Sequence, residues 1–386
     1  MADWIGINRR ARRCYGFDEV ALVPGDKTVN PNEVDTSWSI GEMTFNIPIL
    51  AASMDGVVNV KFAIEMGKLG GIAVLNLDGI QTRYENPDEI LDQIAEASPD
   101  EATKLIQTLY TKPVKDALIA RRIEEIKKHK VPAVVSCIPQ NAKKFADIAT
   151  EAGCDMFVVQ STVATVRHVA TEYKAFDIEK FCREIKIPVI LGNTVSYDVS
   201  LELMEAGVAG ILVGIGPGAA CTSRGVLGIG VPQITATVDC AAARDYFFKR
   251  KGKYVPIITD GGMRIGGEIC KAIAAGGDAC MVGSAFAKSF EAPGRGYHWG
   301  MATSNANLPR GTRVKVGQAG TLKEILLGPA KVDDGSQNLV GALKTSMGSL
   351  GASNIKEMHD VEIIIAHSFQ SEGKVFQMSQ KIGMGK

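Results

Sequence analysis

Eight short apolar runs, separated by amphipathic stretches of helical periodicity, limit the possible fold more than any other feature of the chain. The runs are rich in Val, Ile and Leu and apolar at consecutive positions, which is typical of parallel strands buried on both faces. We expect strands at 47–53, 71–76, 133–138, 156–160, 189–192, 210–215, 255–259 and 279–283. We expect helices at 60–69, 114–130, 142–152, 177–185, 200–206, 234–249 and 266–275. Eight strands favour an α/β fold of the closed (β/α)8 TIM-barrel type, in one domain over residues 1–386; an open doubly wound sheet is the alternative.

The composition excludes several classes of protein. Lys plus Arg equals Asp plus Glu at 43 each, so no charge excess favours a nucleic acid or an anionic membrane as partner. No apolar run approaches the roughly 18 residues of a membrane span, and the N-terminus lacks the apolar centre of a signal peptide. The eight cysteines are widely spaced and show no zinc-ligand pattern. We therefore expect a soluble, cytoplasmic protein.

A glycine-rich turn after the sixth expected strand carries one cysteine. Gly216 and Gly218 bracket a proline, and Cys221 follows close to Arg224. Glycine adopts backbone angles closed to other residues, which favours a tight, exposed loop at a strand end. A thiolate beside a cation and loop amides would be nucleophilic. The alternative is a strained loop with an incidental cysteine.

The barrel interpretation also predicts where an active site lies. In such barrels the functional residues follow the strands at their C-terminal ends. Polar residues and glycines do follow six of the expected strands: Met54-Asp55-Gly56, Ser161-Thr162, Asn193-Thr194, the Cys221 loop, Asp260-Gly261-Gly262 and Ser284. This convergence on one mouth favours a site at Cys221 over an incidental cysteine.

The turns after the seventh and eighth expected strands suggest an anion site. Gly261-Gly262 and Gly283-Ser284 occupy the usual phosphate position of these barrels, where backbone amides and a following helix favour an anion. A carboxylate at Asp260 would suit a ribose diol. The alternative is that Asp-Gly-Gly is only a turn, with Asp260 as a helix cap.

Two segments fall outside the alternating pattern. Segment 78–112 is interpreted as polar helix and loop, broken at Asn86-Pro87 and Ser98-Pro99. Segment 291–320 has no sustained periodicity, and in a barrel it would be a short flap over the mouth. A plain surface connection is the other interpretation of that segment.

Several motifs together are specific enough to suggest a family. Residues 216–224 and 228–233 closely resemble the catalytic loop of the IMP dehydrogenase/GMP reductase family. Further similar stretches are 17–20, 48–55, 260–264, 281–284, 291–294 and 341–352, so the resemblance runs almost end to end. It implies a (β/α)8 barrel. Most dehydrogenases of the family insert a pair of regulatory CBS repeats after the second strand, and 78–112 is too short to hold them.

The resemblance also implies a chemistry, in which a cysteine thiolate attacks C2 of a purine nucleotide and hydride passes between C2 and a nicotinamide. It makes Cys221 the nucleophile and Asp260 the ribose ligand. It assigns the phosphate to Gly262, Gly283 and Ser284, and the purine edge to Gly300, Met301 and Ala302.

For the cofactor, the resemblance implies three binding residues, Asn193, Gln160 and Ser161, with Asn193 near the nicotinamide. It also implies that backbone carbonyls of Gly216, Gly218 and Cys221 hold a monovalent cation such as K+. The chain departs from the family pattern beside the cysteine and at one cofactor position. The serine that usually precedes the cysteine by two is Ala219, and the usual ribose-binding aspartate is Gln160.

The flap favours one of the family's two reactions. Dehydrogenases hydrolyse the covalent adduct with an Arg-Tyr pair on a long flap, but here the flap, residues 294–311, is short and the one Arg-Tyr dipeptide is Arg83-Tyr84. We therefore expect a GMP reductase, which converts GMP and NADPH to IMP and ammonia with help from the Ser223 hydroxyl. The signature is incomplete, because Arg310 stands where reductases have a glutamate.

Two other functions remain open, namely an IMP dehydrogenase that oxidises IMP with NAD and a non-catalytic nucleotide sensor. The choice between NADPH and NADH is also open. A homotetramer or homo-octamer is what the resemblance implies for assembly.

Overall fold

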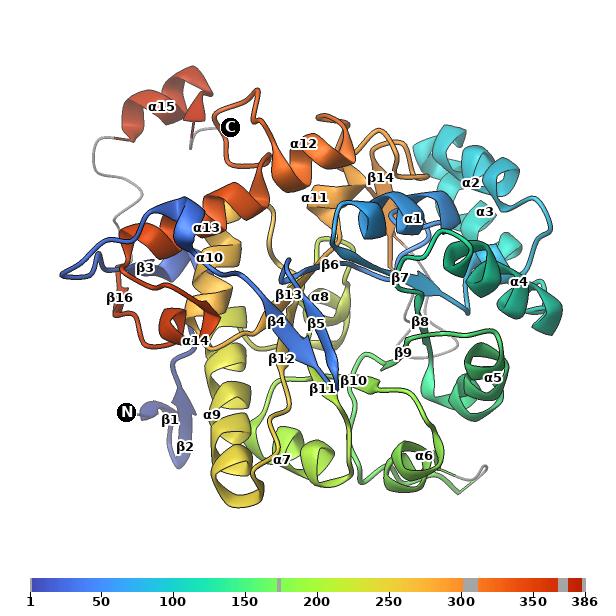
Figure 1. Cartoon of the computed structure of the whole chain (residues 1–386), viewed down its shortest axis with the longest axis horizontal. Helices are drawn as coiled ribbons and strands as arrows, with labels where there is room; N and C mark the ends of the chain where they lie inside the picture. The colour runs from blue at the N-terminus through green and yellow to red at the C-terminus, as the bar shows by residue number, and fades with distance from the viewer. Residues whose placement is uncertain (1, 172–174, 301–311, 367–373, 384–386) are drawn as a thin grey trace.

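The computed structural model describes residues 2–171, 175–300, 312–366 and 374–383. Its centre is a closed barrel of eight parallel strands (Figure 1). The strands are β6 (Ile49–Ala51), β7 (Ile72–Asn76), β8 (Val134–Cys137), β9 (Met156–Gln160), β10 (Val189–Thr194), β11 (Gly210–Val213), β12 (Ile257–Asp260) and β13 (Ala279–Val282). Each coincides with an expected strand, so the predicted TIM barrel is confirmed and the open sheet is not.

Helices surround the strands, as the periodicity predicts (Figure 1). The seven expected helices are α1 (Val60–Lys68), α4 (Asp116–Lys127), α5 (Pro139–Glu151), α6 (Ile178–Glu184), α7 (Tyr197–Glu205), α9 (Gln233–Lys251) and α10 (Gly266–Ala274). Most boundaries lie within about three residues of the prediction. Among the described residues, no helix has the length and apolarity that a membrane crossing requires.

The core has two layers because successive strand residues point to opposite sides. Leu50 belongs to the cluster inside the barrel, whereas Ile49 and Ala51 belong to the cluster beneath the helices. The hairpin of β4 (Trp38–Ile40) and β5 (Met43–Phe45) adds Trp38, Ile40 and Phe45 to the interior cluster.

Segment 78–112 is more regular than expected. After the short helix η3 (Ile80–Thr82) it forms a helical hairpin of α2 (Pro87–Glu96) and α3 (Pro99–Leu109). The two prolines begin these helices instead of breaking the segment, since the first helical position needs no N–H donor. The segment leads directly into α4 with no further domain between β7 and β8.

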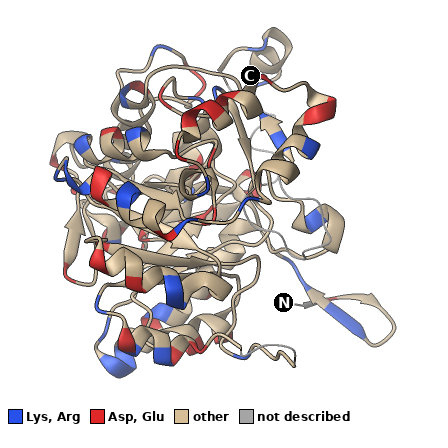
Figure 2. Ribbon diagram, turned by 90° about the vertical axis from the view of Figure 1, so that its right-hand side faces the viewer, with Lys and Arg blue, Asp and Glu red and all other residues tan. Residues whose placement is uncertain are grey.

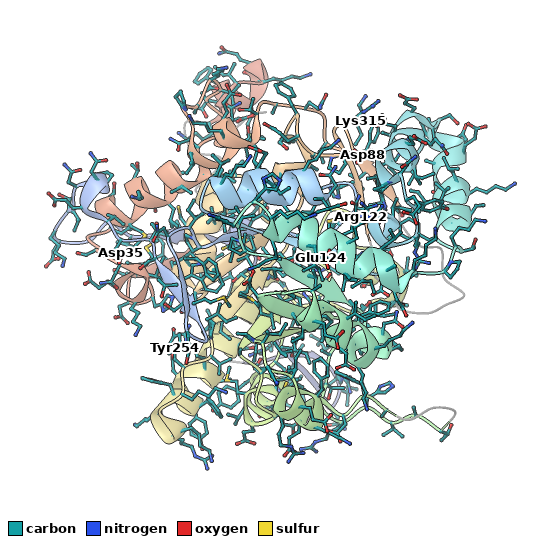
Figure 3. All side chains as sticks on the ribbon, turned by 45° about the vertical axis from the view of Figure 1, so that its right-hand side comes forward. Asp35, Asp88, Arg122, Glu124, Tyr254 and Lys315 are labelled. Carbon is teal, nitrogen blue, oxygen red and sulfur yellow. The ribbon has the colours of Figure 1, made fainter. Side chains whose placement is uncertain are left out.

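The segment after β13 also contains elements that the sequence did not reveal. β14 (Tyr297–Trp299) pairs antiparallel with β15 (Arg313–Lys315). Lys315 of β15 and Asp88 of α2 lie at the same edge of the molecule (Figure 3). A three-residue strand leaves almost no periodicity to read, which is why the pattern was missed.

The surface carries Lys and Arg interspersed with Asp and Glu (Figure 2), as the equal numbers of the two charges suggest. The hairpin of β1 (Ala2–Gly6) and β2 (Arg9–Arg12) projects from the body near the N-terminus (Figure 2).

Candidate active site

A cavity of about 350 Å³ opens at the C-terminal ends of the barrel strands. Residues at or just beyond the end of every barrel strand line it. Twelve of the predicted site residues line the cavity: Gln160, Ser161, Asn193, Gly216, Gly218, Cys221, Ser223, Asp260, Gly262, Gly283, Ser284 and Gly300. Met301, Ala302 and Arg310 lie outside the described residues.

The cysteine loop leaves β11 through glycines with positive φ. Gly214 has φ 149°, and a side chain there would collide with the Asp260 carbonyl oxygen at 2.3 Å. Gly216 has φ 86°. The loop therefore requires glycine at both points for the backbone angles, and at Gly214 also for the close approach to β12.

This loop places a thiol and a hydroxyl together. Cys221 is exposed, and its Sγ lies 3.4 Å from Oγ of Ser223, a buried residue at the start of α8 (Ser223–Leu227). Arg224 turns elsewhere, since its guanidinium donates to the Val231 carbonyl at 2.8 Å. The observed partner of the thiol is thus the Ser223 hydroxyl. The expectation that Arg224 lies beside the thiolate is wrong, because its guanidinium instead braces the loop.

Asp260 ends β12 and receives two amide donors in the cavity. Its Oδ2 accepts from Nδ2 of Asn193 at 2.7 Å and from Nε2 of Gln160 at 3.0 Å. Ser53 holds the other end of Gln160, donating to its Oε1 at 2.9 Å. Burial raises the pKa of Asp260 to about 6, and the hydrogen bond from Asn193 opposes this rise. The Asp260 carboxylate is therefore oriented by side chains from β9 and β10, across the mouth of the barrel.

The two glycine turns lie where the anion site was expected. Gly261 and Gly262 have φ 85° and 84°, and Gly262 packs closely on Pro217 of the cysteine loop. Gly283 precedes Ser284, whose Oγ lies 3.0 Å from Nε2 of His298. Backbone amides and a hydroxyl thus border one end of the cavity.

His298, on β14, is a site residue that the sequence reasoning missed. It is 1% exposed and lines the cavity, and burial lowers the pKa of its imidazole to about 4. Its Nδ1 is buried with no hydrogen-bond partner among the described residues. The one available signal was its place two residues before Gly300, in a segment thought to be irregular.

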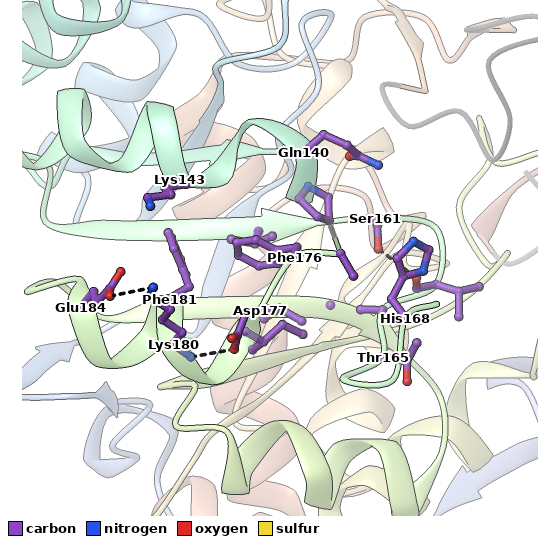
Figure 4. A pocket seen from close by; sticks show the side chains of 18 residues that line it. Gln140, Lys143, Ser161, Thr165, His168, Phe176, Asp177, Lys180, Phe181 and Glu184 are labelled. Carbon is purple, nitrogen blue, oxygen red and sulfur yellow. Dashed lines mark hydrogen bonds and ion pairs between the residues drawn. The ribbon is translucent and has the colours of Figure 1, made fainter. Parts of the chain in front are cut away.

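A second cavity of about 530 Å³ adjoins the first, between α5 and α6 (Figure 4). Phe176 and Phe181 lie on its wall, with Lys143 and His168 at the edges. Ser161 lines both cavities and therefore marks their junction.

No group of three or more metal-binding side chains occurs among the described residues. The expected cation ligands are backbone carbonyls instead. Gly216, Gly218 and Cys221 lie in one loop, where the Gly218 carbonyl accepts the Cys221 N–H at 3.0 Å. One lone pair of that oxygen is thus occupied, and the cation site stays a prediction.

The fold and site define a (β/α)8-barrel protein with an exposed cysteine at the mouth formed by the C-terminal ends of the strands, and with glycine turns suited to an anion. The family model described as IMP dehydrogenase / GMP reductase domain matches residues 14–376. The chain belongs to this family and is an oxidoreductase.

Relatives agree over nearly the whole chain. A Mycobacterium tuberculosis protein described as an uncharacterized oxidoreductase is 36% identical over 370 residues, which cover 94% of this chain and 99% of the relative. An inosine-5'-monophosphate dehydrogenase from Cryptosporidium parvum is 30% identical over 392 residues, covering 89% of each chain. The crystal structure of an IMP dehydrogenase/GMP reductase-like protein from Corynebacterium glutamicum superposes with a TM-score of 0.89 at 34% identity, covering 95% of this chain and 98% of that one.

Proposed function

We propose that the protein is a GMP reductase that uses NADPH to convert GMP to IMP and ammonia. The observation that carries the proposal concerns the one Arg-Tyr dipeptide of the chain. Arg83 donates to the Asp78 carbonyl at 2.9 Å, and Tyr84 donates to the Leu109 carbonyl at 2.9 Å. Neither residue lines the cavity.

The flap, residues 294–311, offers no replacement for that pair. Its one tyrosine, Tyr297, lies on β14 beneath the Arg313 guanidinium and does not line the cavity. A dehydrogenase must activate water to hydrolyse its adduct, whereas a reductase must not. The site therefore suits the reductive reaction.

In this mechanism the Cys221 thiolate adds to C2 of the guanine, and the C2–N2 bond breaks as the amino group takes up protons and leaves as ammonia. In this scheme Ser223 helps to move a proton to the departing nitrogen. The 3.4 Å distance between its Oγ and the Cys221 Sγ supports this role. NADPH, when bound, supplies the hydride that C2 requires. The C2–S bond then breaks, which releases IMP and regenerates the thiolate.

The remaining residues hold the nucleotide in this scheme. Asp260 accepts the ribose hydroxyls, with Asn193 and Gln160 orienting its carboxylate. The amides of Gly262 and Gly283 and the Ser284 hydroxyl receive the phosphate. Gly300 borders the purine; Met301 and Ala302, which the resemblance also assigns to the purine edge, lie outside the described residues.

The second cavity supports a dinucleotide cofactor. The nicotinamide end would lie near Asn193 and Ser161, and the cavity continues past Ser161 with a further volume of about 530 Å³. Gln160 donates to Asp260 and so contacts the proposed substrate side of the site. This contact explains why Gln160 stands at a position where the family's dehydrogenases have an aspartate that binds the cofactor ribose: the Gln160 side chain is directed to Asp260 instead.

A dehydrogenase is the second candidate, because curated relatives of this chain carry that name. Paired assays on one preparation distinguish the two. We expect loss of NADPH absorbance with GMP, and little NADH formation with IMP and NAD. Sustained XMP production that exceeds GMP reduction would reverse the assignment.

The raised pKa of Asp260 makes GMP binding depend on pH. Above about pH 6 the carboxylate is ionised and accepts two ribose hydroxyls; as pH falls through 6, protonation removes part of that acceptor capacity and affinity falls. Asp260→Asn should weaken binding at pH 7.5 by about 1–3 kcal/mol.

Calorimetry of both proteins between pH 5 and 8 tests this prediction. The phosphate of GMP itself titrates near pH 6, so the difference between the two profiles isolates Asp260. Parallel profiles would show that Asp260 is not the ribose ligand.

A further inference from the structure

A buried hydrogen-bond relay connects the helical hairpin of α2 and α3 to β14. The indole Nε1–H of Trp299 donates to the Tyr110 hydroxyl at 2.9 Å, and that hydroxyl donates to Oδ2 of Asp55 at 2.5 Å. The Ile80 N–H donates to the same carboxylate oxygen at 2.8 Å. Trp299 and Asp55 are fully buried and Tyr110 is 7% exposed, so water does not replace these bonds easily.

The packing around these hydrogen bonds holds β14 in a fixed position. Trp299 and Tyr110 belong to one apolar cluster with Ile80, Leu91, Ile94 and Ile106, from η3, α2 and α3. On the other side, β14 lies against Gly56, where an added side chain would come within 2.9 Å of the His298 Cα and 3.0 Å of the Trp299 ring. β14 is thus held between the hairpin and the loop that follows β6.

β15, the strand that pairs with β14, is hydrogen-bonded to the same hairpin. Arg313 of β15 donates to the carbonyls of Ile94, Ala95 and Ala97 at 2.5, 3.2 and 2.8 Å, which are carbonyls at the C-terminal end of α2. A cation is favourable at that end of a helix dipole. The Arg313 guanidinium also covers the Tyr297 ring at 4.3 Å.

Successive side chains of β14 point in opposite directions, so the contacts that hold Trp299 also fix the residues of β14 that face the site. Trp299 points into the hairpin, and the residue before it, His298, points to Ser284 in the cavity. Gly300, which follows, lines the cavity as well. A displacement of the Trp299 ring therefore moves His298 and Gly300 relative to the anion and purine ends of the site.

We propose that Tyr110 and Arg313 are positioning residues for nucleotide binding, and that the α2–α3 hairpin is the platform that sets β14 against the catalytic mouth. The proposal rests on the proposed function for the identity of the ligand. It assigns a task to the hairpin that stands between β7 and β8. Neither residue touches the nucleotide in this scheme, and their effect passes through Trp299 and β15.

The test is nucleotide protection of Cys221 from iodoacetamide, with the labelled peptide quantified by mass spectrometry and GMP as the probe. In Tyr110→Phe the indole N–H of Trp299 loses its acceptor, so β14 is no longer held in the position that binds the nucleotide. Part of the free energy of GMP binding must then be used to return β14 to that position. The GMP concentration for half-protection should rise by about 10-fold, as expected for one unsatisfied buried donor. Labelling without GMP should be unchanged, since the Cys221 loop leaves β11.

Tyr84→Phe is the matched control. Its hydroxyl donates to the Leu109 carbonyl within the same hairpin and, in the described part of the chain, makes no hydrogen bond to β14. This variant should therefore lower the thermal midpoint without moving half-protection. Arg313→Lys is the second variant, because an ammonium cannot span three carbonyls, and it should shift half-protection in the same direction as Tyr110→Phe. Steady-state assays should show the change in KM for GMP and less than about a 3-fold change in kcat.

Equal shifts in Tyr84→Phe and Tyr110→Phe would reduce the effect to hairpin stability and overturn the proposal. Unchanged half-protection in both Tyr110→Phe and Arg313→Lys would overturn it as well. Failure of GMP to protect Cys221 in the unmodified protein is a different result, which would refute the proposed function and with it the ligand of this platform.

Discussion

Cys221→Ser is expected to retain the barrel and nucleotide binding and to lose GMP reduction by several orders of magnitude. A serine hydroxyl is far less ionised near neutral pH than a thiol, so the attack on C2 fails. The fold should persist because Cys221 is exposed and its side chain fills no core volume.

Turnover of GMP with NADPH, measured beside GMP affinity by calorimetry, checks this expectation. Cys14→Ser is the matched control, since Cys14 is another partly accessible cysteine and lies outside the cavity. A Cys221→Ser protein with a rate near that of the unmodified enzyme would exclude covalent catalysis.

Ser223→Ala should slow release of ammonia from GMP by about 10²–10⁴-fold, the usual contribution of one proton-transfer group. The Ser223 hydroxyl is the partner observed at Cys221, and its residue is buried at the start of α8. Removing it should leave the thiol accessible, so alkylation of Cys221 by iodoacetamide should continue.

Single-turnover ammonia release and the pH profile of kcat separate a proton-transfer role from a packing role. Ser223→Thr keeps the hydroxyl and should restore most of the rate lost in the alanine protein. If alanine and threonine at this position behave alike, the hydroxyl is not the proton carrier.

Much of the architecture follows from local sequence pattern. A strand such as β9, Met156–Gln160, is apolar at successive positions, and a helix such as α1 repeats its apolar residues every three to four positions. The glycines around the Cys221 loop report backbone angles that other residues avoid, and the barrel rule places whatever follows a strand at one mouth. These features depend on neighbours in the chain, which is why they could be predicted.

The tertiary structure alone decided which side chains meet within that mouth. Gln160 and Asp260 are 100 residues apart, and nothing in the local sequence indicates that the Gln160 amide would orient the Asp260 carboxylate. The same holds for His298, whose lowered pKa arises from burial by other segments.

The short elements were hidden for a related reason. β14 has three residues, too few for a period of two to be seen, and its place is set by the bond from Trp299 to Tyr110 across 189 positions. The sequence by itself determined the barrel, the exposed cysteine and the glycine turns, because backbone preference and periodic burial are local. The carboxylate network, the second cavity and the platform under β14 needed the tertiary structure, because each depends on burial by segments distant in the chain.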